Sequence, residues 1–217
     1  MAASCFLFLG GVPAAAYELP KDASARKPGF EFPADMPARA DGRWLMEKMG
    51  TISDGKTTFD IQKVWEICLD GKADRALHEL EVREQQASVA SLNEACDEPR
   101  PVYSQGVLSW AMHCQGPSHV DDKVGKTDIR HSTSFISGSE TRAESVIVNR
   151  DNLIHSNGRF LTHMKRLGDC GGGLTPGGML LMHWRVNGEE TLKARQRRNV
   201  FEDVANSKVF TASSLGR

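Results

Sequence analysis

The sequence has no long apolar run and no excess of charge of either sign. No stretch reaches the roughly 20 consecutive apolar residues that a membrane-spanning helix requires, so we expect no membrane span. The 27 Lys and Arg residues balance 28 Asp and Glu residues, which excludes a strongly basic nucleic-acid-binding protein and a polyacidic tail. With 40% hydrophobic residues in a chain of 217, a core can form, and we expect one domain or two small ones.

The common metal-binding and catalytic motifs are missing as well. The cysteines lack the Cys-x-x-Cys spacing of zinc sites, and the adjacent His113 and Cys114 would point to opposite faces of a strand. The glycines around Leu174 lack the terminal Lys of a phosphate loop. Residues 168–172 have the Gly-x-Cys-x-Gly pattern of a nucleophile elbow, but the glycines and proline after them cannot begin the helix that this device needs. We therefore expect no metal and no cofactor.

The first sixteen residues have the features of a secretory signal peptide. The apolar stretch Cys5–Leu9 is too short to span a bilayer, and Ala14–Ala16 supplies small residues for cleavage before Tyr17. No Lys or Arg precedes the apolar stretch, and a buried N-terminal strand is the alternative interpretation. We expect a signal peptide at 1–16 and a periplasmic or secreted mature protein.

Four cysteines remain after that cleavage, namely Cys68, Cys96, Cys114 and Cys170. An even number of cysteines in an exported protein indicates two disulfides, and four cysteines allow three connectivities. Cys96 and Cys114 flank the chain-breaking segment 97–101, which suits a local bridge. The other two cysteines would then close a long loop.

Alternation of polar and apolar residues between turn signals is typical of antiparallel strands and covers most of the remaining chain. The expected strands are 42–49, 57–65, 107–114, 126–136, 141–149, 158–167 and 179–186. An Asp-Gly pair at 54–55 predicts a hairpin between the first two. Helical spacing of apolar residues predicts one helix from Asp74 to Leu92. The sequence therefore predicts a mainly β protein, with a curved antiparallel sheet or partial barrel and one helix inserted before Cys96.

Composition divides the chain into four segments: a signal peptide at 1–16, an extended arm at 17–41, a disulfide-linked β domain at 42–170, and a Gly-rich linker with a C-terminal extension at 171–217. The extension is ambiguous, because Asn187-Gly188 favours a hairpin whereas the residues after it have a helix-forming composition. Its basic cluster lacks interleaved aromatics, so we interpret it as a solvated face rather than a nucleic-acid patch.

Several segments of the β domain resemble the domain of unknown function 3617 family. They are, in order, Gly42-Arg43-Trp44, Ile67-Cys68-Leu69, Cys96, Trp110-Ala111-Met112-His113-Cys114 and Arg166-Leu167-Gly168-Asp169-Cys170. The resemblance covers about residues 42–170. It implies export, paired cysteines and a β-rich domain, and it implies no particular reaction. The sequence departs from the family in lacking Met-rich strands, in having more His and Arg in its later strands, and in continuing well past its last cysteine.

The later strands carry the candidate catalytic residues His131, His163, Glu144 and Arg130. In a rolled sheet these side chains would act as acid, base and anion clamp at neutral pH. Two alternatives are a transition-metal site that uses His155 with the two other histidines, and ordinary solvent-facing strand residues.

The sequence is compatible with functions of different classes. The favoured hypothesis is an exported β protein that binds an apolar or amphipathic small molecule, or another envelope protein, in the concave face of its sheet. The alternative is a cofactor-independent exported lyase, isomerase or hydrolase that uses His131 and His163. A structural envelope component that makes contacts through its basic tail is a third hypothesis.

Overall fold

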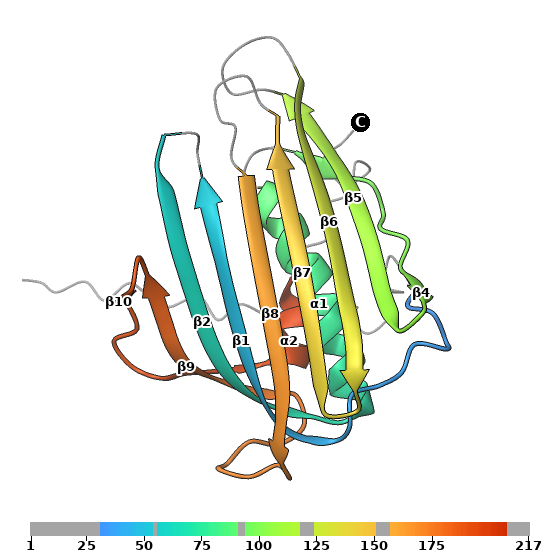
Figure 1. The fold of residues 1–217 in the computed structure, drawn as a ribbon, viewed down its shortest axis with the longest axis vertical. Helices are drawn as coiled ribbons and strands as arrows, with labels where there is room; N and C mark the ends of the chain where they lie inside the picture. Colours follow the sequence, from blue (N-terminus) through green and yellow to red (C-terminus); the bar gives the residue numbers. More distant parts are fainter. Residues whose placement is uncertain (1–30, 54–55, 91–93, 118–123, 151–156, 208–217) are drawn as a thin grey trace, which may run out of the picture.

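The protein forms one large antiparallel sheet with two helices on its concave face, as the computed structural model shows (Figure 1). The structure describes residues 31–53, 56–90, 94–117, 124–150 and 157–207. The expected signal peptide at 1–16 lies outside this part of the chain. In the view of Figure 1 both helices lie behind the sheet, so the convex face is toward the reader. The expected fold class, a mainly β protein with a curved antiparallel sheet, is confirmed.

The helices are α1 (Gly71–Ala90) and α2 (Val200–Asn206). The strands are β1 (Gly42–Ser53), β2 (Thr58–Leu69), β3 (Ala95–Cys96), β4 (Val102–Ser104), β5 (Val107–Pro117), β6 (Val124–Ser137), β7 (Glu140–Asn149), β8 (Asn157–Gly168), β9 (Gly178–Val186), β10 (Glu189–Glu190) and β11 (Gln196–Asn199).

The strand order is β10-β9-β2-β1-β8-β7-β6-β5-β3, with β4 added to β5 and β11 added to β9. β1 pairs with both β2 and β8, so the N-terminal hairpin joins the meander β5–β8 along the middle of the sheet. The sheet stays open. Strict alternation of buried and exposed residues along β5 shows that one face packs against the helix while the other faces solvent.

Helix α1 begins three residues before the expected start. The Asp70 carboxylate accepts hydrogen bonds from the backbone N–H groups of Lys72 and Ala73, at 3.0 and 2.8 Å, and thereby caps the first turn. Leu77 and Leu80 face the sheet and are almost fully buried. Among the described residues, no helix is long and apolar enough to cross a membrane.

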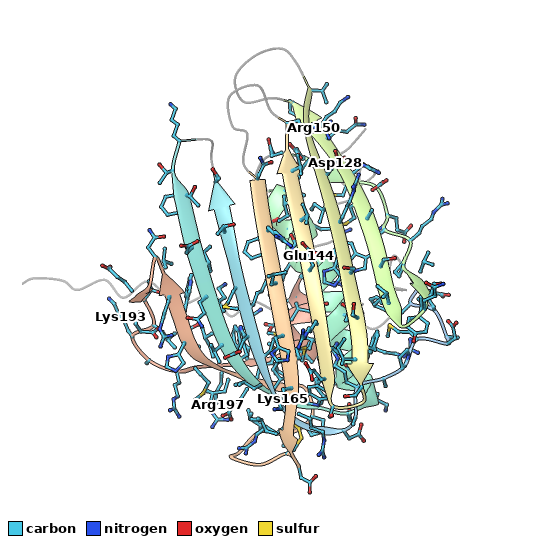
Figure 2. All side chains as sticks on the ribbon, in the orientation of Figure 1. Asp128, Glu144, Arg150, Lys165, Lys193 and Arg197 are labelled. Carbon is cyan, nitrogen blue, oxygen red and sulfur yellow. A yellow bond between two sulfur atoms is a disulfide. The ribbon has the colours of Figure 1, made fainter. Side chains whose placement is uncertain are left out.

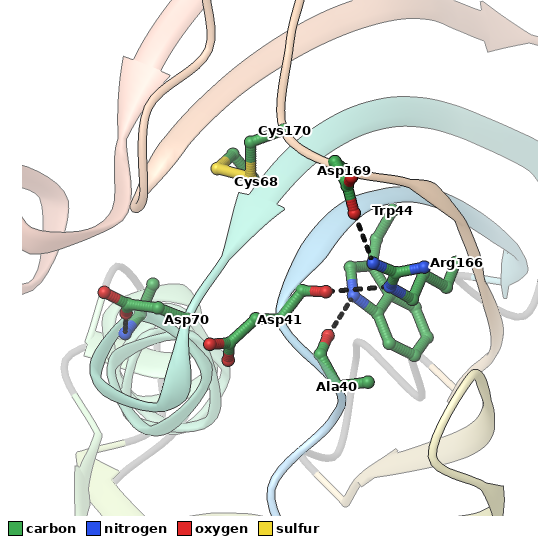
Figure 3. Close-up of a disulfide and its surroundings, with 9 residues drawn as sticks. Ala40, Asp41, Trp44, Cys68, Asp70, Arg166, Asp169 and Cys170 are labelled. Carbon is green, nitrogen blue, oxygen red and sulfur yellow. Dashed lines mark hydrogen bonds and ion pairs between the residues drawn. A yellow bond between two sulfur atoms is a disulfide. The ribbon is translucent and has the colours of Figure 1, made fainter.

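Both expected disulfides are present. Cys96 and Cys114 lie directly opposite each other on β3 and β5, and Cys68 at the end of β2 bonds to Cys170 after β8. Figure 3 shows the second bridge and the adjacent Asp169, whose carboxylate accepts a hydrogen bond from Arg166 at 2.9 Å. Two disulfides are typical of proteins that fold in oxidising compartments.

The segments on either side of the β domain belong to the same fold. After the Gly-rich stretch, β9 pairs with β2 as part of the sheet, and Val200 of α2 is completely buried in the core. The expected Asn187-Gly188 turn is present and joins β9 to β10. The described part of the expected arm, 31–41, is docked as well, because Met36 and Arg39 are buried. The composition shift at residue 170 therefore does not mark the edge of the folded unit.

Candidate functional site

The four candidate catalytic residues do not share a site. Adjacent strand residues face opposite sides, and cross-strand partners face the same side. His131 pairs with Ser145, which pairs with Phe160, and this row lies on the concave face. The other three candidates lie on the convex face, where they are at least partly exposed: Arg130, Glu144 and His163.

On the convex face the candidates engage other partners. The Glu144 carboxylate pairs with Arg159 at 2.6 Å, and the His163 ring contacts Glu140 at 3.0 Å. Figure 2 shows charged side chains such as Asp128, Glu144 and Arg150 on the exposed side of β6 and β7. His155, the third histidine of the metal-site alternative, lies outside the described residues. Within the described residues no group of three or more His, Cys, Asp or Glu side chains is placed to hold a metal ion.

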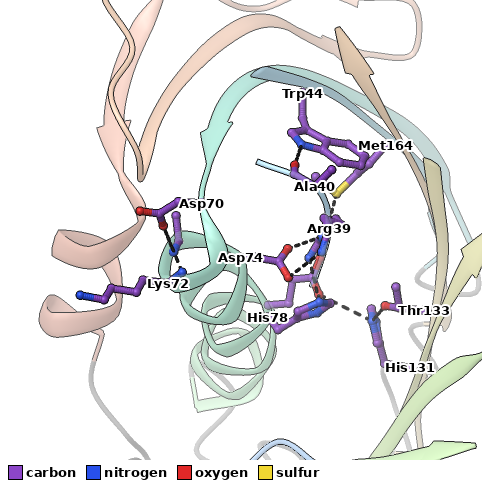
Figure 4. Close-up of polar contacts among 12 residues, drawn as sticks. Arg39, Ala40, Trp44, Asp70, Lys72, Asp74, His78, His131, Thr133 and Met164 are labelled. Carbon is purple, nitrogen blue, oxygen red and sulfur yellow. Dashed lines mark hydrogen bonds and ion pairs between the residues drawn. The ribbon is translucent and has the colours of Figure 1, made fainter. Parts of the chain in front are cut away.

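The concave face instead contains a buried polar chain that begins at Arg39 (Figure 4). The Arg39 Nε donates a hydrogen bond to the Asp74 carboxylate, and its Nη2 donates to Nε2 of His78 at 2.8 Å. Both members of the Arg39–Asp74 pair are almost inaccessible to solvent. Because Nε2 of His78 accepts, its Nδ1 carries the hydrogen and faces Glu81 Oε2 at 3.5 Å.

The chain continues from Glu81 to His131. Nε2 of His131 lies 3.7 Å from Glu81 Oε2 and 2.9 Å from the Thr133 hydroxyl, while Nδ1 contacts the Ser145 hydroxyl at 2.8 Å. The ring stacks on Trp110 with centroids 4.8 Å apart. With both ring nitrogens engaged and one face covered, His131 is held as a structural group rather than presented to a substrate.

The polar chain shifts two pKa values. Burial lowers the pKa of His131 to about 4, although the Glu81 carboxylate acts in the opposite direction. Burial alone would raise the pKa of Glu81, but hydrogen bonding from His78 and the neighbouring positive charges lower it to about 2. At neutral pH the imidazole of His131 is therefore neutral and the carboxyl of Glu81 is ionised.

A cavity of about 420 Å³ lies between α1 and the concave face. Most of its wall is apolar and comes from Met46, Trp65 and Phe160 of the sheet with Leu77 and Leu80 of the helix. The polar side chains that interrupt this wall include Lys48, Lys63, Glu81, Glu84 and Arg198.

Gly50 shapes the cavity wall next to Phe160. A Cβ atom at this glycine would lie 2.2 Å from the Phe160 ring, so the ring covers the strand only because the side chain is missing. The same ring lies 5.3 Å from Nζ of Lys48. The missing side chain at Gly50 thus allows the Phe160 ring to pack against β1, close to the ammonium of Lys48.

Sequence reasoning missed the two lysines of this cavity, although a signal for them existed. A two-residue Asp-Gly turn would pair Ser53 with Lys56 and so place Lys48 opposite Ile61, whereas the structure pairs Ser53 with Thr58 and Lys48 with Lys63. The two registers differ by two residues, so both place the lysines on the same face of the sheet. Each lysine also falls in the apolar row of its strand, after Met46 in β1 and before Trp65 in β2. Two charged residues in the rows that face the core were the available indication of a site.

Comparisons of the chain with protein-family models, with curated proteins and with solved structures find no match. The resemblance to the domain of unknown function 3617 family therefore stays a prediction. The case for a function depends on the cavity and on the residues that line it.

Proposed function

We propose that the protein binds an apolar or amphipathic small molecule in the cavity between α1 and the concave face. The observation that carries this proposal is the cavity of about 420 Å³ itself. Ligand sites are commonly clefts of about 300–1,000 Å³ with mostly apolar walls and a few polar groups that orient the ligand. The lining of this cavity has that composition.

The cavity supports a small molecule better than a large protein partner as the occupant. Helix α1 packs along the concave face through Leu77 and Leu80, and the cavity lies between these layers rather than on an outer surface. A specific protein interface buries about 800 Å² on each partner, and helix α1 already occupies part of the concave face that another envelope protein would need. The alternative is that an extended segment of another envelope protein, rather than a small molecule, enters the cavity.

We also propose that the protein acts outside the cytoplasm. Its two disulfides support this location, because such bonds persist in oxidising compartments and are rare where thiols are kept reduced. The signal-peptide features of residues 1–16 point the same way. A periplasmic or secreted binding protein accounts for both observations.

The test compares two substitutions at neighbouring positions of β8. Thr162 lines the cavity, and Leu161 lies on the convex face with 46% of its surface exposed. We expect N-phenylnaphthylamine, an uncharged apolar fluorophore, to bind the full chain saturably. Thr162→Phe should weaken that binding at least about tenfold by filling the cavity, and Leu161→Phe should leave it unchanged. Absence of saturable binding to the unsubstituted protein, or equal loss in both variants, would overturn the proposal.

A further inference from the structure

We propose that the cavity selects an amphipathic anion, with the negative group held between Lys48 and Lys63 and the apolar body against the surrounding wall. This inference rests on the proposed binding function and specifies its ligand class. A fatty carboxylate is the simplest molecule of this kind. The inference depends on the placement of the two lysines, on their surroundings and on the charges near them.

The two lysines lie in one row across the concave face. Lys48 of β1 is directly opposite Lys63 of β2, and the row continues to Thr162 of β8 on one side and to Trp184 of β9 on the other. Opposed residues in an antiparallel pair have Cβ atoms about 4.5–5.5 Å apart, so the two ammonium groups can reach one small anionic group together.

The rows on either side of this pair are apolar. On the side toward the Cys68–Cys170 bridge, Trp65, Met46 and Met164 are cross-strand neighbours, and on the other side Ile61 and Phe160 flank Gly50. On the sheet side of the cavity, two positive charges therefore lie between apolar rows, while Glu81 and Glu84 line the helix side. The combination matches a ligand with one charged end and an apolar body.

Within the described part of the chain, neither lysine has a carboxylate at ion-pair distance. Instead, each ammonium lies by an aromatic ring: Nζ of Lys48 is 5.3 Å from the centroid of Phe160, and Nζ of Lys63 is 4.7 Å from that of Trp184. Aromatic faces attract cations but do not neutralise them. Opposed like charges destabilise a sheet, so a pair of this kind calls for a compensating ligand.

The nearby acidic groups lie within ion-pair distance of other side chains. Glu84 contacts Arg198 at 3.4 Å, and Arg198 also pairs with Asp203 at 2.8 Å. Glu81 faces His78 and His131.

Burial is the main cause that lowers the pKa of Lys63. Glu84 opposes this effect, and the cations Lys48 and Arg198 add to it. Glu84 and Asp203 both pair with Arg198, which leaves Lys48 and Lys63 without a carboxylate at ion-pair distance among the described residues, and an incoming anion would supply one.

The experiment uses two fluorophores with the same ring system on the full chain. Anilinonaphthalene sulfonate carries a negative charge, and N-phenylnaphthylamine is its uncharged counterpart. We expect the unsubstituted protein to bind the sulfonate at least about tenfold more tightly, which is the range for hydrogen bonds to charged groups. The double variant Lys48→Gln/Lys63→Gln should lose this preference and still bind the neutral probe. Laurate should displace the sulfonate from the unsubstituted protein at a concentration about tenfold lower than from the double variant.

Lys165→Gln is the matched control, because Lys165 lies on the convex face of β8 (Figure 2). It should retain the preference for the sulfonate. If the double variant fails to fold by circular dichroism, Lys48→Gln and Lys63→Gln are tested singly, and each should reduce the preference. Equal binding of both probes by the unsubstituted protein, or an unchanged preference in the lysine variants, would refute the anion inference while leaving the cavity function intact. Failure of both probes to bind would refute the proposed function itself.

Discussion

The two faces of the sheet carry charge in different ways. On the convex face, arginines pair with carboxylates across neighbouring strands or along one strand, as Arg159 does with Glu144 at 2.6 Å. On the concave face, Lys48 and Lys63 oppose each other and contact aromatic rings instead. Exposed ion pairs contribute about 0–1 kcal/mol, so the convex arrangement fits a solvated surface. The concave arrangement works against stability, and this contrast is why we assign function to that face.

A third arrangement lies deeper on the concave side. Arg39 and Asp74 form a pair that is almost inaccessible to solvent, and Arg39 also donates to His78. A buried pair whose remaining groups are hydrogen-bonded tolerates burial, but removal of one partner leaves the other charge uncompensated. We therefore expect the fold to depend on the buried Arg39–Asp74 pair and to be more stable without the opposed charges of Lys48 and Lys63.

Asp74→Asn should cause the largest loss of stability. The buried Arg39 guanidinium would lose its carboxylate, and we expect the free energy of unfolding to fall by about 3–5 kcal/mol. Glu144→Gln removes the partner of Arg159 on the convex face and should cost no more than about 1 kcal/mol. Urea denaturation of both variants measures the difference. Similar losses in the two variants would show that burial does not separate the two faces energetically.

Much of the fold could be predicted from the sequence, because it depends on local patterns. Alternation along the strands, the turn residues and the four cysteines predicted the sheet and both disulfides. The packing of the segment around Arg39 against helix α1 could not be predicted. It depends on Asp74 and His78, which lie in that helix and are separated from Arg39 in the chain by β1 and β2. Helix α2 was likewise ambiguous, because its stability comes from burial of Val200 as well as from its own composition.

The candidate site was harder to predict for a related reason. The histidines were chosen as candidate catalytic residues because they titrate near neutral pH. Side chains alternate between the two faces along each strand, however, and the strand register places His131 and His163 on opposite faces. Lysines are common at solvent-facing positions of strands, so Lys48 and Lys63 were not chosen as candidate site residues. The position of Lys48 inside an apolar row indicates that it faces the core, but the presence of a cavity there depends on the helix that covers the row, which is tertiary information.

The second prediction is that lowering the pH destabilises the protein first through protonation of His131 on the concave face. In the unfolded chain His131 has the ordinary pKa of about 6.5, whereas in the folded protein burial lowers the pKa to about 4. Between these values the unfolded state binds a proton that the folded state does not. The stabilisation is therefore fully present above about pH 6.5 and falls by about 3 kcal/mol as the pH drops to about 4.

Unfolding midpoints in urea, compared at neutral pH and at about pH 4.5, measure this loss. His131→Gln retains hydrogen-bonding groups for Thr133 and Ser145, and its midpoint should change less over the same interval. The lowered pKa of Glu81, about 2, adds a separate loss at more acidic pH, because its stabilisation disappears as the pH falls from about 4.5 through that value. An identical pH dependence in the two proteins would mean that His131 is not the group responsible.

The smallest expected effect bears most directly on the contrast between the faces. Lys63→Gln removes one of two opposed positive charges and keeps a long polar side chain, so it should raise the free energy of unfolding by about 0.2–1 kcal/mol in the absence of ligand. Lys165→Gln on the convex face should change stability by less than about 0.5 kcal/mol. A gain in stability at Lys63 together with a loss of anion binding would show that the protein retains an unfavourable pair for recognition. A loss of stability at Lys63 would instead show that its contact with Trp184 outweighs repulsion from Lys48, and the lysine pair would then be explained by the fold.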